Sequence, residues 1–317
     1  RHGVVEQTRR HSFIVSLLGI RDVVVAVNKM DLVGWSEEAF DDIRNCYQKL
    51  ADDLDLADPY FLPMSALLGD NVVDTGHNLN WFDGPPLMQY LETVDVATGV
   101  DLNHLRLPVQ MVLRPDQDFR GFAGTVASGV LRPGDEVVAL PSGMRSTVER
   151  IVTFDGDLEV AGPGWAVTVT LADEIDVSRG DLLVGGDDSP NRAHEVDATI
   201  VWMDTEPMEP GRQYLLRSAT GQSNASVTSI RHRVDVNTLA ERPAAALGLN
   251  DIARCAISTD RELLFDPYDT NRQTGSFVLV DRLSNATVGA GMVIEASSGW
   301  DRQPDAGLVR HASEISS

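Results

Sequence analysis

With 317 residues, of which 43% are hydrophobic, the chain is long and apolar enough for two or three domains with cores of their own. Its net charge of −22 argues against nucleic acid as a partner, because phosphate binding depends on Lys and Arg, and we interpret the acidity as an aid to solubility or an adaptation to salt. Two distant cysteines, Cys46 and Cys255, indicate neither a disulfide framework nor a metal site, and no signal peptide or membrane-spanning stretch is visible, so the cytoplasm is the expected compartment.

The first hundred residues predict alternating helices and strands. In chain order we expect a helix at Val5 to Leu18, a strand at Val23 to Val27, a helix at Ser36 to Asp53, a strand at Tyr60 to Met64 and a helix at Pro85 to Val94. Gly19 ends the first helix, and Ser36 followed by acidic residues is typical of a helix N-terminus. This alternation indicates half of a doubly wound α/β domain, which we assign to residues 1–97.

The segment Asn28-Lys29-Met30-Asp31 directly follows the first strand. It resembles the Asn-Lys-x-Asp element with which P-loop GTPases bind guanine, although four residues alone also match an ordinary charged turn. The chemistry fits guanine, because an ionised Asp31 only accepts hydrogen bonds and its two oxygens match the N1–H and 2-amino donors of that base. Adenine lacks this pair of donors, and such mismatches discriminate by factors of about 10⁴ or more. Asn28 would reach the N7/O6 side of the base or tie neighbouring loops, and the alkyl stem of Lys29 would lie across the ring.

Ser65, Ala66 and Leu67 follow the second strand, about 35 residues after the first motif. In the GTPase family the corresponding turn offers a backbone N–H to O6 of guanine, so small residues are needed for close approach. Ser-Ala-Leu alone also fits an ordinary strand-to-loop turn. Its spacing from the first motif favours one guanine pocket built from both segments.

The elements that would hold phosphate and magnesium are missing from the sequence. The chain contains no Gly-x-x-x-x-Gly-Lys-Ser/Thr loop, and no Asp-x-x-Gly segment precedes the first strand. It begins at Arg1, without an initiator Met and directly ahead of the first predicted helix. We therefore expect an N-terminally truncated GTP-binding domain that has no catalytic residue and no Mg²⁺ ligand in this chain and does not hydrolyse GTP as given.

From Leu107 onward, short β-branched runs alternate with turns rich in Gly, Pro and Asp, which predicts two antiparallel β-barrels at 105–190 and 193–295 and a tail or linker at 296–317. In the first barrel we expect strands at Pro108 to Leu113, Gly121 to Gly129, Glu136 to Leu140, Ser146 to Thr153, Ala166 to Leu171 and Asp181 to Val184. In the second we expect them at Val196 to Met203, Gln213 to Arg217, Ala225 to Val236, Ile252 to Ile257 and Ser276 to Asp281. Asp155-Gly156 indicates a hairpin.

A partial GTPase domain followed by two β-barrels resembles the elongation-factor-Tu-like family and, within it, the large GTP-dependent subunits of bacterial sulfate adenylyltransferases. The similarity extends over residues 1 to about 295. The segments that carry it are Gln7 to Ser12, Asn28 to Leu32, Asp118 to Gly129, Ile151 to Asp157, Asp173 to Asp181 and Asp281 to Met292.

The resemblance implies a heterodimer. A small subunit transfers the adenylyl group of ATP to sulfate, giving adenosine 5′-phosphosulfate, and GTP hydrolysis on the large subunit is coupled to this uphill reaction. Carried over to this sequence, Asn28, Lys29 and Asp31 recognise guanine and the Ser65–Leu67 turn completes the pocket. The resemblance also implies a fused or associated adenylylsulfate kinase as a further partner.

Two other functions remain open from the sequence. A translation factor that binds tRNA or the ribosome would share the guanine motif and the barrels, but tRNA-binding barrels need a basic surface, and the net charge of −22 argues against it. The chain could also serve as a binding module whose barrels hold the partner subunit.

Overall fold

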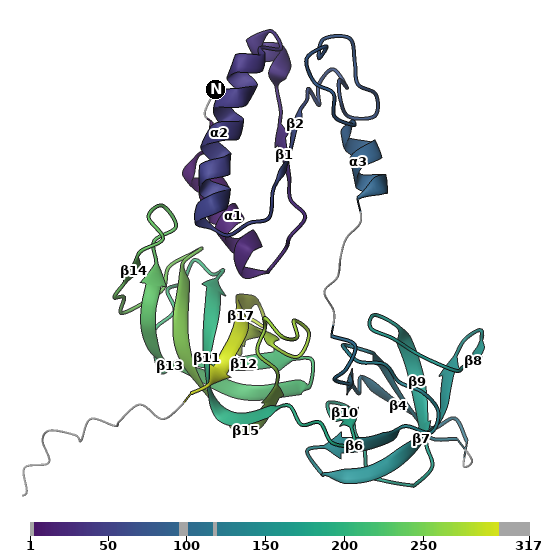
Figure 1. Cartoon of the computed structure of the whole chain (residues 1–317). Coiled ribbons are helices and arrows are strands. Elements are labelled where there is room, and N and C mark those ends of the chain that lie inside the picture. Colours follow the sequence, from purple (N-terminus) through teal and green to yellow (C-terminus); the bar gives the residue numbers. More distant parts are fainter. Residues whose placement is uncertain (1–2, 95–100, 117–118, 298–317) are drawn as a thin grey trace, which may run out of the picture. The chain divides into compact units, whose positions relative to one another are not determined.

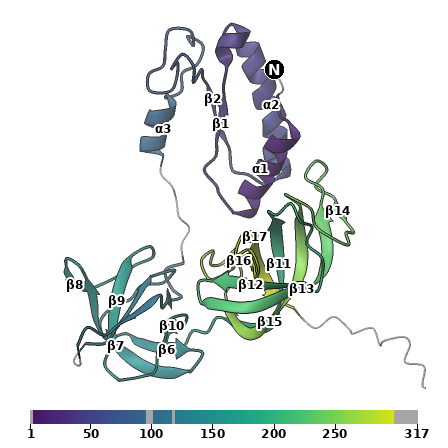
Figure 2. The same cartoon turned by 180° about the vertical axis from the view of Figure 1, so that it is seen from behind.

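The structure, a computed structural model, describes residues 3–94, 101–116 and 119–297 (Figure 1, Figure 2). It divides into two compact units, of which the first comprises Arg1–Val100 with Val234–Arg242 and the second Asp101–Arg233 with Pro243–Ser317. The expected fold class, part of a GTPase α/β domain followed by two antiparallel β-barrels, is confirmed. The boundary expected at residue 97 lies outside the described residues, as do Asp118 and residues 298–317 of the tail expected at 296–317.

The first unit contains a two-stranded parallel sheet with helices around it (Figure 1). Its elements are α1 (Glu6–Leu17), β1 (Val24–Val27), the 3₁₀ helix η1 (Met30–Val33), α2 (Glu37–Asp53), β2 (Tyr60–Pro63) and α3 (Leu87–Thr93). The five predicted helices and strands are confirmed to within two residues at each end. Ser36 caps α2 as predicted, since its Oγ accepts a 3.2 Å hydrogen bond from the N–H of Ala39.

Neighbouring residues of β2 face opposite sides of this sheet, as strand geometry requires. Phe61 packs with Val25 in a cluster that α2 closes with Tyr47. On the other side, the ring of Tyr60 stacks on that of Tyr90 in α3, with centroids 4.2 Å apart. Because β1 and β2 are parallel, their carboxyl ends lie side by side at one end of the sheet, where the two sequence motifs begin. The packing on both faces holds the strands in place.

The first barrel of the second unit is an eight-stranded sheet. Its strands are β3 (Arg106–Pro108), β4 (Met111–Leu113), β5 (Gly121–Thr125), β6 (Glu136–Leu140), β7 (Met144–Thr153), β8 (Gly156–Leu158), β9 (Ala166–Leu171) and β10 (Leu182–Gly185). They follow the order β3-β10-β6-β7-β9-β5-β4, and β8 pairs with β7 in the predicted hairpin. A bridge between Arg106 and Ser128 joins β3 to the segment after β5 and brings the two edges together.

The prediction of one strand from Pro108 to Leu113 is wrong, because this segment forms two strands. β3 pairs with β10, whereas β4 pairs with β5, so the chain changes partner between them. At the change, the N–H of Val109 bonds to the Asp181 carbonyl at 2.8 Å. The backbone of β5 comes so close that a Cβ at Gly124 would lie 2.2 Å from the Pro108 carbonyl oxygen. This corner therefore requires glycine.

The second barrel is a seven-stranded sheet. Its strands are β11 (Asn191–Trp202), β12 (Gln213–Ser218), β13 (Gly221–Val234), β14 (Glu241–Arg242), β15 (Ile252–Phe265), β16 (Ser276–Asp281) and β17 (Thr287–Ala296). Six of them close into a barrel in the order β12-β16-β17-β11-β15-β13, since β12 also pairs with β13. Trp202, Tyr214 and Phe265 are buried in its core. The sequence did not predict β17, whose Gly291 makes room for the Phe277 ring, 2.0 Å from where a Cβ would lie.

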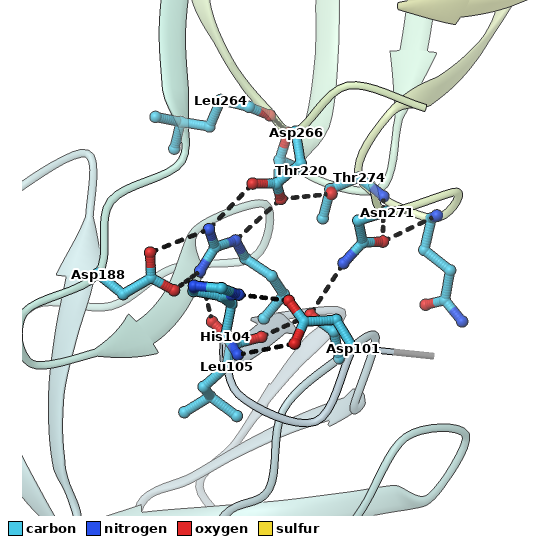
Figure 3. Close-up of polar contacts among 12 residues, drawn as sticks. Asp101, His104, Leu105, Asp188, Thr220, Leu264, Asp266, Asn271 and Thr274 are labelled. Carbon is cyan, nitrogen blue, oxygen red and sulfur yellow. Dashed lines mark hydrogen bonds and ion pairs between the residues drawn. The ribbon is translucent and has the colours of Figure 1, made fainter. Parts of the chain in front are cut away.

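A buried arginine joins the two barrels, and its partners Asp188 and Asp266 are labelled in Figure 3. Arg106 on β3 donates from Nε and Nη2 to the two carboxylate oxygens of Asp266, both at 2.9 Å, and from Nη1 to Asp188 at 2.6 Å. Burial opposes its charge, but the two carboxylates raise the pKa of Arg106. Asn271 adds a 2.9 Å hydrogen bond from its Nδ2 to Oγ of Ser128. Residues of both barrels thus form one polar network.

Candidate nucleotide-binding site

The two motifs meet at the carboxyl ends of β1 and β2. Hydrogen bonding between the two segments continues past the strands, since the N–H of Met64 bonds to the Val27 carbonyl at 3.0 Å and that of Met30 to the Met64 carbonyl at 3.2 Å. Met30 is buried beside Val27 and Phe40. This apolar anchor holds η1 in place and leaves the polar residues on either side of Met30 at the surface.

Asp31 and Ser65 are in direct contact. The hydroxyl of Ser65 donates a 2.7 Å hydrogen bond to Oδ1 of Asp31, and Ser65 is fully buried. The same hydroxyl oxygen accepts a 3.3 Å hydrogen bond from the N–H of Leu68. Among the residues that the structure describes, Oδ2 of Asp31 has no hydrogen-bond partner. The carboxylate is therefore oriented through one oxygen, while the other remains available as an acceptor.

Asn28 ties the two loops together, which was one of its two expected roles. Its Oδ1 accepts hydrogen bonds from the N–H of Lys29 at 2.7 Å and from that of Ala66 at 3.0 Å. Neither Nδ2 of Asn28 nor the N–H of Leu67 bonds to any described residue. Because the Ala66 N–H already has an acceptor, the free N–H of this turn belongs to Leu67, whose side chain is 85% exposed.

Lys29 adopts the left-handed conformation, with φ 69° and ψ 34°. For a residue with a Cβ this conformation costs roughly 1–2 kcal/mol, and it persists only where the surroundings fix it. Here the bond from its N–H to Asn28 and the buried Met30 on its other side fix the backbone. The side chain is exposed, and Lys29 is one of only two lysines among 26 basic residues in the chain.

Asn71, which was not singled out from the sequence, holds the backbone that leads into the Ser65–Leu67 turn. Asn71 is fully buried and has φ 60°. Its Nδ2 donates a 2.8 Å hydrogen bond to the Pro63 carbonyl, and its N–H bonds to the Asp74 carbonyl at 2.8 Å. Asn tolerates left-handed backbone, but nothing in the polar segment around it marks this position as structural.

The free groups at this edge match guanine in kind. The free acceptor of Asp31 is of the kind that the N1–H and the 2-amino group of guanine require, and the Nδ2 of Asn28 and the N–H of Leu67 are donors of the kind that N7 and O6 require. For the phosphates the chain offers no comparable set, since its sequence contains no Gly-x-x-x-x-Gly-Lys-Ser/Thr loop. Within the described ranges no cluster of three or more His, Cys, Asp and Glu side chains could hold a metal ion. The free groups at the ends of these strands therefore match a guanine base and not the phosphates of a nucleotide.

Two family models match the chain. One, described as the elongation factor Tu GTP binding domain, matches residues 1–111, and another, described as GTP-eEF1A C-terminal domain-like, matches residues 195–294. Among solved structures, Sup35 complexed with GDP is similar, with a TM-score of 0.58 and 20% identity over 92% of this chain and 73% of that one. At this identity the likeness establishes the fold alone.

Curated relatives are far more similar in sequence. The chain is 54% identical to sulfate adenylyltransferase subunit 1 of Aeromonas salmonicida, covering 93% of this chain and 63% of that protein. It is 53% identical to the protein of the same name from Chromobacterium violaceum, covering 94% and 62%. With the bifunctional enzyme CysN/CysC of Rhodopirellula baltica it shares 50% identity, covering 95% and 48%. The chain thus spans less than two thirds of the length of these relatives.

No helix in the described part of the chain is both long and apolar enough to cross a membrane.

Proposed function

Because the chain belongs to the family of sulfate adenylyltransferase subunit 1, within the elongation-factor-Tu-like GTP-binding proteins, we propose that it forms the base-recognising part of a GTP-binding subunit. In this proposal Asn28, Lys29 and Asp31 bind guanine together with the turn of Ser65, Ala66 and Leu67. The subunit couples GTP hydrolysis to the formation of adenosine 5′-phosphosulfate from ATP and sulfate.

The observation that carries the proposal is the hydrogen bond between Ser65 and Asp31. It fixes a carboxylate beyond the ends of the strands through one lone pair of Oδ1. Oδ2 and the second lone pair of Oδ1 remain as two neighbouring acceptors, and a carboxylate so placed selects a base that presents two adjacent donors. Adenine would leave those acceptors unpaired. Selection by a preset acceptor is what a GTP-specific subunit needs in a cell that is rich in ATP.

Each residue then has a defined task. Ser65 orients the Asp31 carboxylate, and Asn28 keeps the two loops in register through its bonds to Lys29 and Ala66. The alkyl part of Lys29 covers one face of the base. Bound GTP would supply the hydrolysable phosphate, and Mg²⁺ and the phosphates would require ligands from outside this chain.

The proposed partner is the small, adenylyl-transferring subunit, and the proposed compartment is the cytoplasm. An adenylylsulfate kinase, fused or associated, is a further proposed partner, and one relative, from Rhodopirellula baltica, is named a bifunctional enzyme. A role in translation has less support, because a chain with a net charge of −22 lacks the excess of basic residues that binding to RNA phosphates requires.

The test needs a protein with a complete phosphate site. We suggest a chimera in which the Gly-x-x-x-x-Gly-Lys-Ser/Thr half of an elongation-factor-Tu-like GTPase precedes residue 1. Its GTP hydrolysis is measured alone, with the small subunit, ATP and sulfate, and with ribosomes and tRNA. We expect stimulation by the small subunit and its substrates. Stimulation by ribosomes or tRNA alone would contradict the proposal.

A further inference from the structure

A cavity of about 940 Å³ lies in the second unit, lined by residues of both barrels. One wall is the turn before β10, and another is the hairpin between β12 and β13. The two walls come close at their glycines, since a Cβ at Gly180 would lie 3.4 Å from the Thr220 carbonyl oxygen and 3.6 Å from Cα of Gly221. Thr220 and Leu264, which line the cavity, lie next to the polar network of the barrels (Figure 3).

Three arginines line this cavity: Arg179 from the first barrel, and Arg217 and Arg261 from the second. In the described part of the chain, none of the three guanidinium groups makes a hydrogen bond or ion pair with another residue. All three side chains are exposed, as are those of other arginines of this chain, so what distinguishes them is that they surround one cavity. Arg261 has one electrostatic neighbour, the Asp260 carboxylate, which accepts a 2.6 Å hydrogen bond from the hydroxyl of Ser223. Guanidinium groups that surround one cavity offer several hydrogen-bond donors to the same anion.

The two carboxylates in the lining are occupied elsewhere. Oδ2 of Asp181 accepts a 2.8 Å hydrogen bond from the N–H of Ser178. Glu262 lies 4.0 Å from Nη1 of Arg192, which is outside the cavity. The lining therefore carries three positive and two negative charges, in contrast to the net charge of −22 of the whole chain.

The remaining lining combines apolar side chains with two free amides. Pro141, which is exposed, and Ala219, which is half-buried, contribute apolar surface, with the buried Val109, Leu216 and Leu263 behind them. Gln110 and Gln222 add side-chain amides that have no hydrogen-bond partner among the described residues. A volume of about 940 Å³ is within the range of roughly 300–1,000 Å³ that small-molecule sites occupy.

We propose that this inter-barrel cavity binds a nucleoside polyphosphate. Its phosphates would bond to Arg179, Arg217 and Arg261, and its nucleoside part would lie against the apolar side chains and the free amides. Because the arginines come from both barrels, the bound nucleotide would tie the barrels together and stabilise them. The site uses no residue of the guanine-binding loops and goes beyond the proposed function.

The experiment is calorimetric titration of the 317-residue chain with ATP at low ionic strength. We expect saturable binding that each single Arg→Gln substitution at positions 179, 217 and 261 weakens by about tenfold, and that the triple variant weakens by roughly a hundredfold or more. The matched control replaces Arg21, Arg132 and Arg282 by Gln. These three are exposed, lie outside the cavity and have no ion pair among described residues, so binding should stay within about twofold of the original.

Two further titrations distinguish nucleotide binding in the cavity from binding at the guanine-binding loops and from binding of phosphate alone. Asp31→Ala removes the guanine acceptor, and ATP binding should not change, whereas a loss would assign the ATP to the guanine-binding loops and overturn the proposal. Pyrophosphate should compete with ATP but bind at least tenfold more weakly, because it lacks the nucleoside part. No saturable ATP binding, equal binding by the cavity triple variant, or pyrophosphate binding as tight as ATP binding would each overturn it.

Discussion

The Ser65 hydroxyl donates a 2.7 Å hydrogen bond to Oδ1 of Asp31, a residue 34 positions earlier in the chain. The bond links two loops that leave neighbouring parallel strands, and Asn28 links them a second time through the N–H of Ala66. Two side-chain bonds within the chain thus hold the proposed base-recognition edge. This preorganisation is the basis of the first prediction.

Ser65→Ala should weaken guanine nucleotide binding by the chimera by roughly tenfold to a hundredfold, because a buried hydrogen bond to a charged group contributes roughly 1.5–3 kcal/mol. Equilibrium titration with GDP measures the change. If Ser65 acts through Asp31, the double variant Ser65→Ala/Asp31→Ala should bind no more weakly than Asp31→Ala alone. Additive losses would show that Ser65 contributes independently of the carboxylate.

Arg106→Met should destabilise the pair of barrels by about 3–5 kcal/mol, because it leaves Asp266 and Asp188 without their buried counter-ion. The midpoint of urea unfolding, followed by the fluorescence of the buried Trp202, measures this effect. Combining Arg106→Met with Asp188→Asn and Asp266→Asn should recover a large part of the loss. A triple variant as unstable as the single one would contradict the account of the network.

The two thiols should differ sharply in reactivity. Burial raises the pKa of Cys255 to about 12, so this thiol stays neutral and enclosed in the folded barrel, whereas Cys46 is exposed on α2. An alkylating reagent at pH 8 should modify one thiol per folded chain and two after unfolding. Mass spectrometry identifies the site, and modification of Cys255 in the folded protein would contradict the packing of this barrel.

Ionisation of Asp281 should make the stability of the second barrel depend on pH in the acidic range. Hydrogen bonds from the N–H groups of Ser284 and Leu283 and from the Arg212 guanidinium lower the pKa of Asp281 to about 2, from an ordinary 3.8. A carboxyl group that is more acidic when folded stabilises the folded state above pH 3.8, and this contribution is lost as the pH falls from 3.8 to about 2.

Asp281→Asn should therefore reduce the loss of stability between pH 5 and pH 2.5, measured by urea unfolding at both values. The exposed Glu209→Gln serves as the control, since the Glu209 side chain has no hydrogen-bond partner in the described ranges. An unchanged acid dependence in Asp281→Asn would contradict the assignment.

Much of the fold could be predicted from the sequence where hydrophobic pattern and turn chemistry agree. β1 and α2 are such cases, because β-branched residues mark the strand and Ser36 with its acidic first turn marks the helix start. β17 and the break between β3 and β4 could not be predicted, because both depend on tertiary contacts. Position 291 requires glycine because the Phe277 ring occupies the space that a Cβ would need. The break arises because β3 pairs with β10 whereas β4 pairs with β5.

For the candidate site, the sequence predicted the residues that meet but not how they are held. The resemblance of both motifs to GTPase elements, together with their spacing, was enough to expect Asp31 near the Ser65–Leu67 turn, and the hydrogen bond between Asp31 and Ser65 confirms that they meet. The support from Asn71, the left-handed backbone of Lys29 and the free N–H of Leu67 depend on the loop conformation. Arg106 was not singled out either, because its partners lie 82 and 160 residues away in the chain.

The most direct test of the central claim, that the Asp31 carboxylate reads guanine, is the base preference of Asp31→Asn. Competition titrations of the chimera with GDP and xanthosine diphosphate are compared before and after the substitution. Asn presents a donor as well as an acceptor, so the preference should shift from guanine towards xanthine, which carries a carbonyl in place of the 2-amino group. An unchanged preference for guanine in Asp31→Asn would show that Asp31 does not contact the base and would contradict the account.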